Sequence, residues 1–242
     1  MSRKPILTEA QHVTGALALG LILCLAPKGD AVAQHPSQSE PSDDDLRVYA
    51  VHVNRTPSQS WPGYGMYLEN GLVLTASHVP GNFADTKPRA IIAGQDQPTA
   101  LVKQGSLEGV DLTLLSVDAN ALPVAMRLRR LPLCERSPFA GDPVVVVTPE
   151  SAVRSHVLPP SAVPAELRGR FATVIVDVAN TGNSGSGVLD ARRPCLLGIV
   201  SRKISISPVG ARLGSPAATR DIAKYFVPVE EIRAFIPPDV PF

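Results

Sequence analysis

Three side chains in this chain of 242 residues could together break an acyl bond. His78 ends a stretch of small residues after one apolar run, and Asp111 stands directly before another. Ser184 lies in the segment 182–187 (Gly-Asn-Ser-Gly-Ser-Gly), whose glycines permit a tight turn and close approach of a substrate. A serine hydroxyl can attack a carbonyl when an imidazole takes its proton and a carboxylate orients that imidazole. The three residue types therefore predict nucleophilic catalysis, provided that the fold brings them together.

The backbone of segment 182–187 could supply a further part of such a site. Successive N–H groups in a tight turn, here those of Gly182 and Ser184, can converge on the oxyanion that develops during acyl transfer. A flexible Gly/Ser loop has a similar composition. This segment is short, however, and lies between the apolar runs 172–178 and 188–189, which favours a fixed turn.

Each of these side chains also has an ordinary explanation. A single histidine at a strand is more often structural, and an acid before a strand is often only a turn residue. Three other histidines fit such roles, because His35 lies in a polar stretch, His52 in an apolar run and His156 in a proline-bearing loop. The chemistry therefore depends on the elements that position the three residues.

Short apolar runs recur from residue 46 onward, and most of them span four to eight residues. Many are rich in Val, Ile or Thr, and Asn70-Gly71 between two of them is typical of a β-hairpin. No helical pattern alternates with these runs, which argues against a parallel βαβ sheet. One short helix is expected near the end of the chain, where apolar residues share a face over 229–236 and Pro237-Pro238 follow. The pattern predicts an all-β antiparallel chain with a C-terminal helix.

The charge balance argues against some functions. Lys and Arg number 23 and Asp and Glu 22, so no basic field is available to hold a phosphate backbone, and no nucleic-acid partner is expected. Hydrophobic residues make up 44% of the chain, which argues against global disorder. The 24 prolines argue against a bundle of long helices, because each removes a backbone donor.

The first 33 residues have the features of a signal peptide. Two basic residues, Arg3 and Lys4, precede the apolar run 15–26, and Ala31-Val32-Ala33 has the small-x-small pattern of a cleavage site. The run is shorter than the roughly 20 residues that span a bilayer, although an uncleaved anchor and a buried helix remain alternatives. We expect a secreted or periplasmic protein without stable membrane insertion after cleavage. Residues 34–45 are polar and acidic, and a disordered tail is expected there.

Two of the three cysteines, Cys134 and Cys195, lie beyond the leader that contains Cys24. An even number in an oxidising compartment favours one disulfide between them. Two free buried thiols are the alternative. A zinc site is not expected, because neither cysteine has a partner two residues away.

The order His78…Asp111…Ser184 on an antiparallel all-β chain resembles the chymotrypsin-like (trypsin-like) serine proteases. The segment 75–78 (Thr-Ala-Ser-His) looks like the histidine box of that family, 111–115 (Asp-Leu-Thr-Leu-Leu) like its aspartate strand and 182–187 like its serine box. The segment 198–201 (Gly-Ile-Val-Ser) is similar to the strand that lines the substrate cleft. The resemblance covers roughly residues 47–236.

This resemblance implies two six-stranded antiparallel β-barrels with the active site between them, here over 46–125 and 126–242. Ser184 would be the nucleophile, His78 the general base and then acid, and Asp111 the carboxylate that orients the imidazole. The amides of Gly182 and Ser184 would form the oxyanion hole, and Ser201 would support the aspartate. The implied function is a serine endopeptidase acting on protein or peptide substrates without a metal or organic cofactor.

The chain departs from the family's activation and specificity patterns. Asn183 stands where many members have an aspartate that pairs with a new N-terminal amine, so activation by N-terminal insertion is not expected; bacterial-type relatives share this asparagine. Val178 would lie at the base of the primary pocket, which argues against a preference for Arg or Lys and favours an apolar or small side chain. Arg202 and Lys203 could attract an acidic residue or lie on a solvated edge strand. A catalytically idle binding or regulatory protein is the alternative function.

Overall fold

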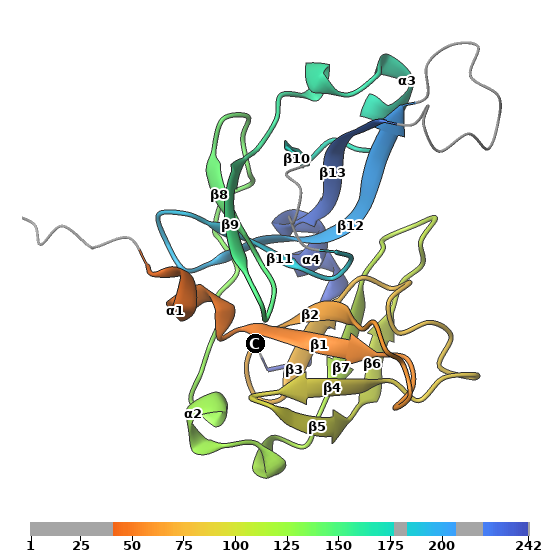
Figure 1. Cartoon of the computed structure of the whole chain (residues 1–242), viewed down its shortest axis with the longest axis vertical. Coiled ribbons are helices and arrows are strands. Elements are labelled where there is room, and N and C mark those ends of the chain that lie inside the picture. The colour runs from red at the N-terminus through yellow and green to blue at the C-terminus, as the bar shows by residue number, and fades with distance from the viewer. Residues whose placement is uncertain (1–40, 177–182, 207–219, 242) are drawn as a thin grey trace, which may run out of the picture. The chain divides into compact units, whose positions relative to one another are not determined.

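The structure is a computed structural model that describes residues 41–176, 183–206 and 220–241. The predicted signal peptide (1–33), Val178 and Gly182 lie outside the described residues. All strand pairs in the described part are antiparallel, and the strands form two sheets (Figure 1).

The first sheet has seven strands in the order β5-β4-β1-β2-β3-β7-β6. They are β1 (Ala50–Asn54), β2 (Gly63–Tyr67), β3 (Leu72–Thr75), β4 (Arg89–Ile92), β5 (Gln95–Pro98), β6 (Ala100–Gln104) and β7 (Thr113–Ser116). The prediction of six strands in this half is therefore wrong by one. Strand β5 (Gln-Asp-Gln-Pro) is mostly exposed and has no apolar run that would announce a strand; it forms by pairing with β4.

The second sheet has six strands, the number that the resemblance implied, in the order β10-β13-β12-β11-β8-β9. Its strands β9 and β13 were not predicted, and His156, expected in a loop, ends β9. They are β8 (Pro143–Val147), β9 (Ala152–His156), β10 (Val174–Val176), β11 (Gly187–Asp190), β12 (Leu196–Ile206) and β13 (Arg220–Pro228). The register of β12 against β13 shifts between Val200 and Arg202. This irregularity lies next to Ser201, where the strand reaches the site described below.

The helices are short. They are α1 (Asp43–Arg47), α2 (Val124–Arg127), α3 (Ala165–Arg168) and α4 (Val229–Phe235), with 3-10 turns at Ala119–Ala121 and Pro160–Ala162. Helix α4 confirms the predicted C-terminal helix, because Val229, Ile232 and Phe235 are buried on one face.

Helix α1 corrects the expected end of the polar tail. Ser42 and Asp45 form a capping box, in which each side chain binds the other residue's backbone N–H. Leu46 in this helix is fully buried. Residues 43–45 are therefore helical rather than disordered.

The largest apolar cluster contains residues from both sheets. Leu74 and Leu114 of the first sheet, Val145 and Ile199 of the second, and Ile232 of α4 all belong to it, and all are fully buried. Each such side chain contributes about 1.5–3 kcal/mol when removed from water. This shared core gives both sheets a common support.

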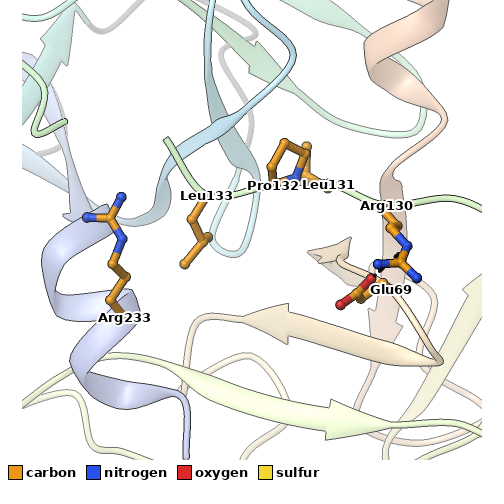
Figure 2. A pocket seen from close by; sticks show the side chains of 6 residues that line it. All are labelled: Glu69, Arg130, Leu131, Pro132, Leu133 and Arg233. Carbon is orange, nitrogen blue, oxygen red and sulfur yellow. Dashed lines mark ion pairs between the residues drawn. The ribbon is translucent and has the colours of Figure 1, made fainter. Parts of the chain in front are cut away.

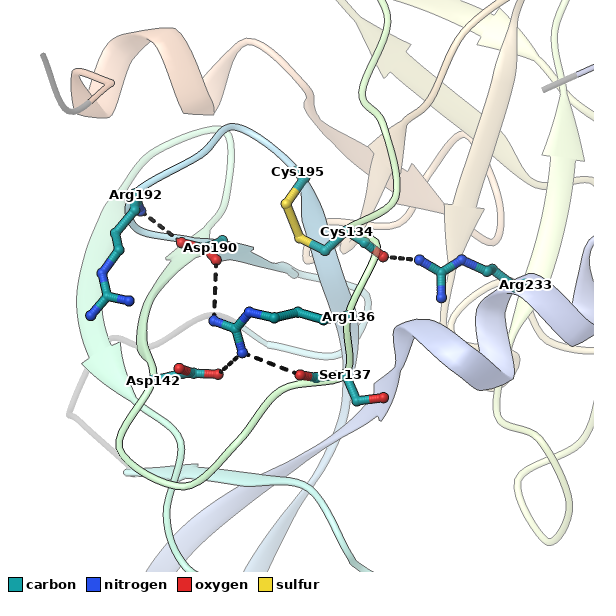
Figure 3. The surroundings of a disulfide bond; sticks show 8 residues. All are labelled: Cys134, Arg136, Ser137, Asp142, Asp190, Arg192, Cys195 and Arg233. Carbon is teal, nitrogen blue, oxygen red and sulfur yellow. Dashed lines mark hydrogen bonds and ion pairs between the residues drawn. A yellow bond between two sulfur atoms is a disulfide. The ribbon is translucent and has the colours of Figure 1, made fainter. Parts of the chain in front are cut away.

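A disulfide joins Cys134 and Cys195, as the sequence predicted (Figure 3). It closes a loop with a sequence separation of 61 residues, and the Cα atoms are 5.0 Å apart. The neighbouring backbone is paired as well, because the N–H of Cys134 donates to the carbonyl oxygen of Leu196 at 3.0 Å. Arg233 of α4 donates to the carbonyl oxygen of Cys134, which connects the bridge to the C-terminal helix.

None of the helices in the described ranges is long and apolar enough to cross a membrane.

Candidate active site

Asp111 is the buried centre of the site. It stands two residues before β7, and its side chain is 1% exposed. Its carboxylate accepts hydrogen bonds from Ser77 Oγ (2.6 Å), Ser201 Oγ (2.5 Å) and the backbone N–H of His78 (3.3 Å). These donors come from both sheets, because Ser77 follows β3 and Ser201 lies in β12. A buried carboxylate needs such partners, since an unpaired buried charge is costly.

His78 completes this set of contacts. Its Nδ1 lies 2.9 Å from Asp111 Oδ2 and 3.1 Å from Oδ1. An ionised carboxylate can only accept, so Nδ1 carries the hydrogen and Nε2 of the neutral ring keeps its lone pair. The side chain is 29% exposed, whereas Asp111 behind it is covered. The imidazole is therefore oriented from its buried side and accessible at the other.

The surroundings keep Asp111 ionised. Burial alone would raise its pKa, but the hydrogen bonds from His78, Ser201 and Ser77 outweigh this effect and lower the pKa from 3.8 to about 2. The sequence did not single out Ser77 as a partner of Asp111, although it stands directly before His78.

Ser184 lies on a turn that backbone hydrogen bonds hold between the two sheets. The N–H of Tyr64 in β2 donates to the carbonyl oxygen of Ser184 at 3.1 Å, and the N–H of Gly185 donates to that of Val200 in β12 at 2.8 Å. Gly185 has φ +90°, and a Cβ atom there would lie 1.8 Å from the carbonyl oxygen of Tyr64. Only glycine fits this position, for both conformation and space.

The hydroxyl of Ser184 donates to the carbonyl oxygen of Ser201 at 3.0 Å. Ser201 thereby contacts both Ser184, through its carbonyl, and Asp111, through its hydroxyl. No hydrogen bond between Ser184 and His78 is found among the described residues. Catalytic hydrogen bonds are often long or misaligned without substrate, and Ser184 and His78 line the same pocket of about 470 Å³.

The proposed specificity residues Arg202 and Lys203 also line this pocket. Arg202 donates to the carbonyl oxygen of Leu107 (2.6 Å) and lies 3.9 Å from Asp111 Oδ2. Lys203 is half-exposed and forms an ion pair with Asp221 at 2.6 Å. A third cation, Lys224 of β13, lines the pocket and is 5% exposed. Lys224 could not be predicted as a pocket residue from the sequence, because its strand carries no motif.

Gly182 and Val178, the expected oxyanion donor and pocket base, lie outside the described residues. Within the described ranges, no group of three or more His, Cys, Asp or Glu residues could hold a metal ion.

A second pocket, of about 410 Å³, is not lined by His78, Asp111 or Ser184. Figure 2 shows Arg233 of α4 on one of its sides and the ion pair of Glu69 and Arg130 on the other, with Leu131–Leu133 between them.

No protein-family model and no curated protein matches this sequence. Among solved structures, the serine endoprotease from Yersinia pestis has a TM-score of 0.53 at 19% identity, and the match covers 78% of this chain and 61% of that one. The Rv3671c protease from M. tuberculosis has a TM-score of 0.52 at 14% identity, with 79% and 81% covered. Kallikrein-related peptidase 10 has a TM-score of 0.52 at 19% identity, with 81% and 96% covered.

These matches and the two antiparallel sheets give the chain the fold of the chymotrypsin-like serine proteases. The resemblance stated from the sequence is confirmed at the level of the fold. The similar structures include both bacterial proteins and a kallikrein, so the bacterial-type branch stays a prediction.

Proposed function

We propose that this chain is an exported serine endopeptidase with Ser184 as nucleophile, His78 as general base and Asp111 as the orienting carboxylate. The observation that carries the proposal is the continuous set of contacts from His78 through Asp111 and Ser201 to Ser184. It occurs in a fold shared with serine proteases. The disulfide between Cys134 and Cys195 and the signal-like leader support export.

The proposed reaction is acyl transfer. Ser184 Oγ would turn from Ser201 toward the substrate and attack the carbonyl carbon while His78 Nε2 takes the hydroxyl proton. The imidazolium, stabilised by Asp111, then gives this proton to the leaving amine, and the C–N bond breaks. Water hydrolyses the acyl-enzyme by the same steps and restores the serine. The amides of Ser184 and Gly182 are the proposed oxyanion donors.

Labelling with a serine-directed phosphonate tests this proposal. The folded protein should react at Ser184, as peptide mass spectrometry would show, and should cleave casein. Ser184→Ala should abolish both, whereas Ser205→Ala, which removes an exposed serine bonded to Asp221, should retain both. Folded wild-type protein that neither reacts nor cleaves would support an idle binding protein instead.

A further inference from the structure

Two peptide planes flank Ser184, one shared with Asn183 and one with Gly185. A trans peptide is planar, so its C=O and its N–H point in opposite directions. Both ends of the plane shared with Gly185 are held. The carbonyl oxygen of Ser184 accepts the N–H of Tyr64 at 3.1 Å. At the other end, the N–H of Gly185 donates to the carbonyl oxygen of Val200 at 2.8 Å, so hydrogen bonds from both sheets fix this plane.

The plane shared with Asn183 is held at its carbonyl end by Ser186. The carbonyl oxygen of Asn183 accepts the backbone N–H of Ser186 at 3.1 Å and the hydroxyl of the same residue at 2.6 Å. The other end of this plane is the N–H of Ser184, and no acceptor for it is found in the described part of the chain. Because the two ends point in opposite directions, the hydrogen bonds that hold the carbonyl also set the direction of this N–H.

Ser186 is itself held in place by the second sheet. It is fully buried, and its carbonyl oxygen accepts the N–H of Val200 in β12 at 2.8 Å. It directly precedes β11, which pairs with both β8 and β12. Its side chain therefore starts from a fixed position and can hold the turn that carries Ser184.

We infer that Ser186 is a positioning residue for the proposed oxyanion hole. Its hydroxyl holds the carbonyl of Asn183 so that the N–H of Ser184 is directed at the oxyanion that forms when Ser184 attacks. This inference rests on the proposed function. An oxyanion donor stabilises a charge that develops only in the transition state, so its direction affects the chemical step rather than the binding of substrate.

The variant Ser186→Ala tests the role of the hydroxyl, because it removes this group and keeps the backbone N–H. Removal of a whole oxyanion donor lowers kcat by about 10²- to 10³-fold. In Ser186→Ala the backbone N–H still holds the same carbonyl, so a smaller loss, about 10-fold in kcat, is expected, with KM unchanged. Initial rates on a fluorogenic peptide measure both constants.

A peptide aldehyde gives a second measurement, because its adduct with a serine hydroxyl is tetrahedral and carries an oxyanion. Its affinity should fall by the same factor as kcat, since the adduct resembles the transition state. Binding of the uncleaved peptide is then compared by calorimetry in Ser184→Ala with and without Ser186→Ala. The two affinities should be equal, because no oxyanion forms in either protein. A merely structural role of Ser186 would weaken this binding as well.

Ser155→Ala is the matched control. Ser155 lies in β9, and its buried hydroxyl oxygen has no hydrogen-bond partner in the described part of the chain. This variant should keep the kcat of the wild type. Thermal melting of each variant identifies loss of folding. If Ser186→Ala does not fold, Ser186→Cys decides, because a thiol occupies a similar space but donates only weakly and should also lower kcat with KM unchanged.

The outcomes separate this inference from the proposed function. Phosphonate labelling of Ser184 together with an unchanged kcat in Ser186→Ala, or with a loss confined to KM, would overturn the positioning role and leave the peptidase standing. Wild-type protein that is neither labelled nor able to cleave the peptide would overturn the peptidase and the positioning role with it.

Discussion

The two sheets hold their parts of the candidate active site by different means. The first sheet places His78 and Asp111 at strand ends and holds them by side-chain hydrogen bonds around a buried carboxylate. The second places Ser184 on a backbone turn whose shape depends on Gly185 and on hydrogen bonds to Tyr64 and Val200. Changes in the first sheet should therefore alter chemistry with the turn intact, whereas changes in the turn should alter the structure itself.

The largest expected effect tests the first sheet. Asp111→Asn should lower kcat by about 10⁴-fold, because an amide can hold the imidazole in the wrong tautomer. Initial rates on a cleaved peptide give the size of the loss, and phosphonate labelling should slow with them. Asp118→Asn, which changes the N-cap of a 3-10 turn, is the matched control and should keep the wild-type kcat. A fall in kcat of less than tenfold for Asp111→Asn would exclude the proposed role of the carboxylate.

The turn that carries Ser184 is tested by Gly185→Ala. A positive φ and a clash with the Tyr64 carbonyl oppose any Cβ atom there, so the free energy of unfolding should fall by about 3 kcal/mol. Urea unfolding measures this change. Gly94→Ala is the control, because Gly94 also has a positive φ (+76°) but nothing lies within 4 Å of its Cβ position. An equal decrease in the free energy of unfolding for both variants would show that the turn is not constrained by packing between the sheets.

The smallest effect concerns the pH dependence of stability. The pKa of Asp111 is lowered from 3.8 to about 2, so the unfolded chain binds a proton more readily. The ionised carboxylate of Asp111 therefore adds about 2 kcal/mol to the free energy of unfolding above about pH 4, and this contribution is lost as the pH falls toward 2. Urea unfolding of the wild type and Asp111→Asn should converge over this range. A stability difference that does not change between pH 5 and pH 2 would contradict the lowered pKa.

Much of this arrangement could be predicted from local sequence. The alternation of Val- and Ile-rich runs with turn residues identifies an antiparallel all-β chain, and the apolar face over 229–236 identifies α4. The chain order of His78, Asp111 and Ser184 identifies the fold family whose structures match. The disulfide followed from counting cysteines beyond the leader.

Other features depended on tertiary contacts. Strand β5 has a polar sequence and forms through pairing with β4, and the last residues of the expected tail belong to a helix whose Leu46 is buried in the largest apolar cluster. Ser77 became a partner of Asp111 only when two strand ends met.

The sequence by itself determined which chemical groups are available. They are an imidazole, a carboxylate and a hydroxyl on short strands that favour an antiparallel sheet. The strand register decided which groups surround these three side chains, because the pairing of β12 with β13 places Lys224 opposite Lys203 at the pocket of Ser184. The physical reason is that strand propensity depends on near neighbours in the chain, whereas the charge of a pocket depends on residues that meet only after the sheets have formed.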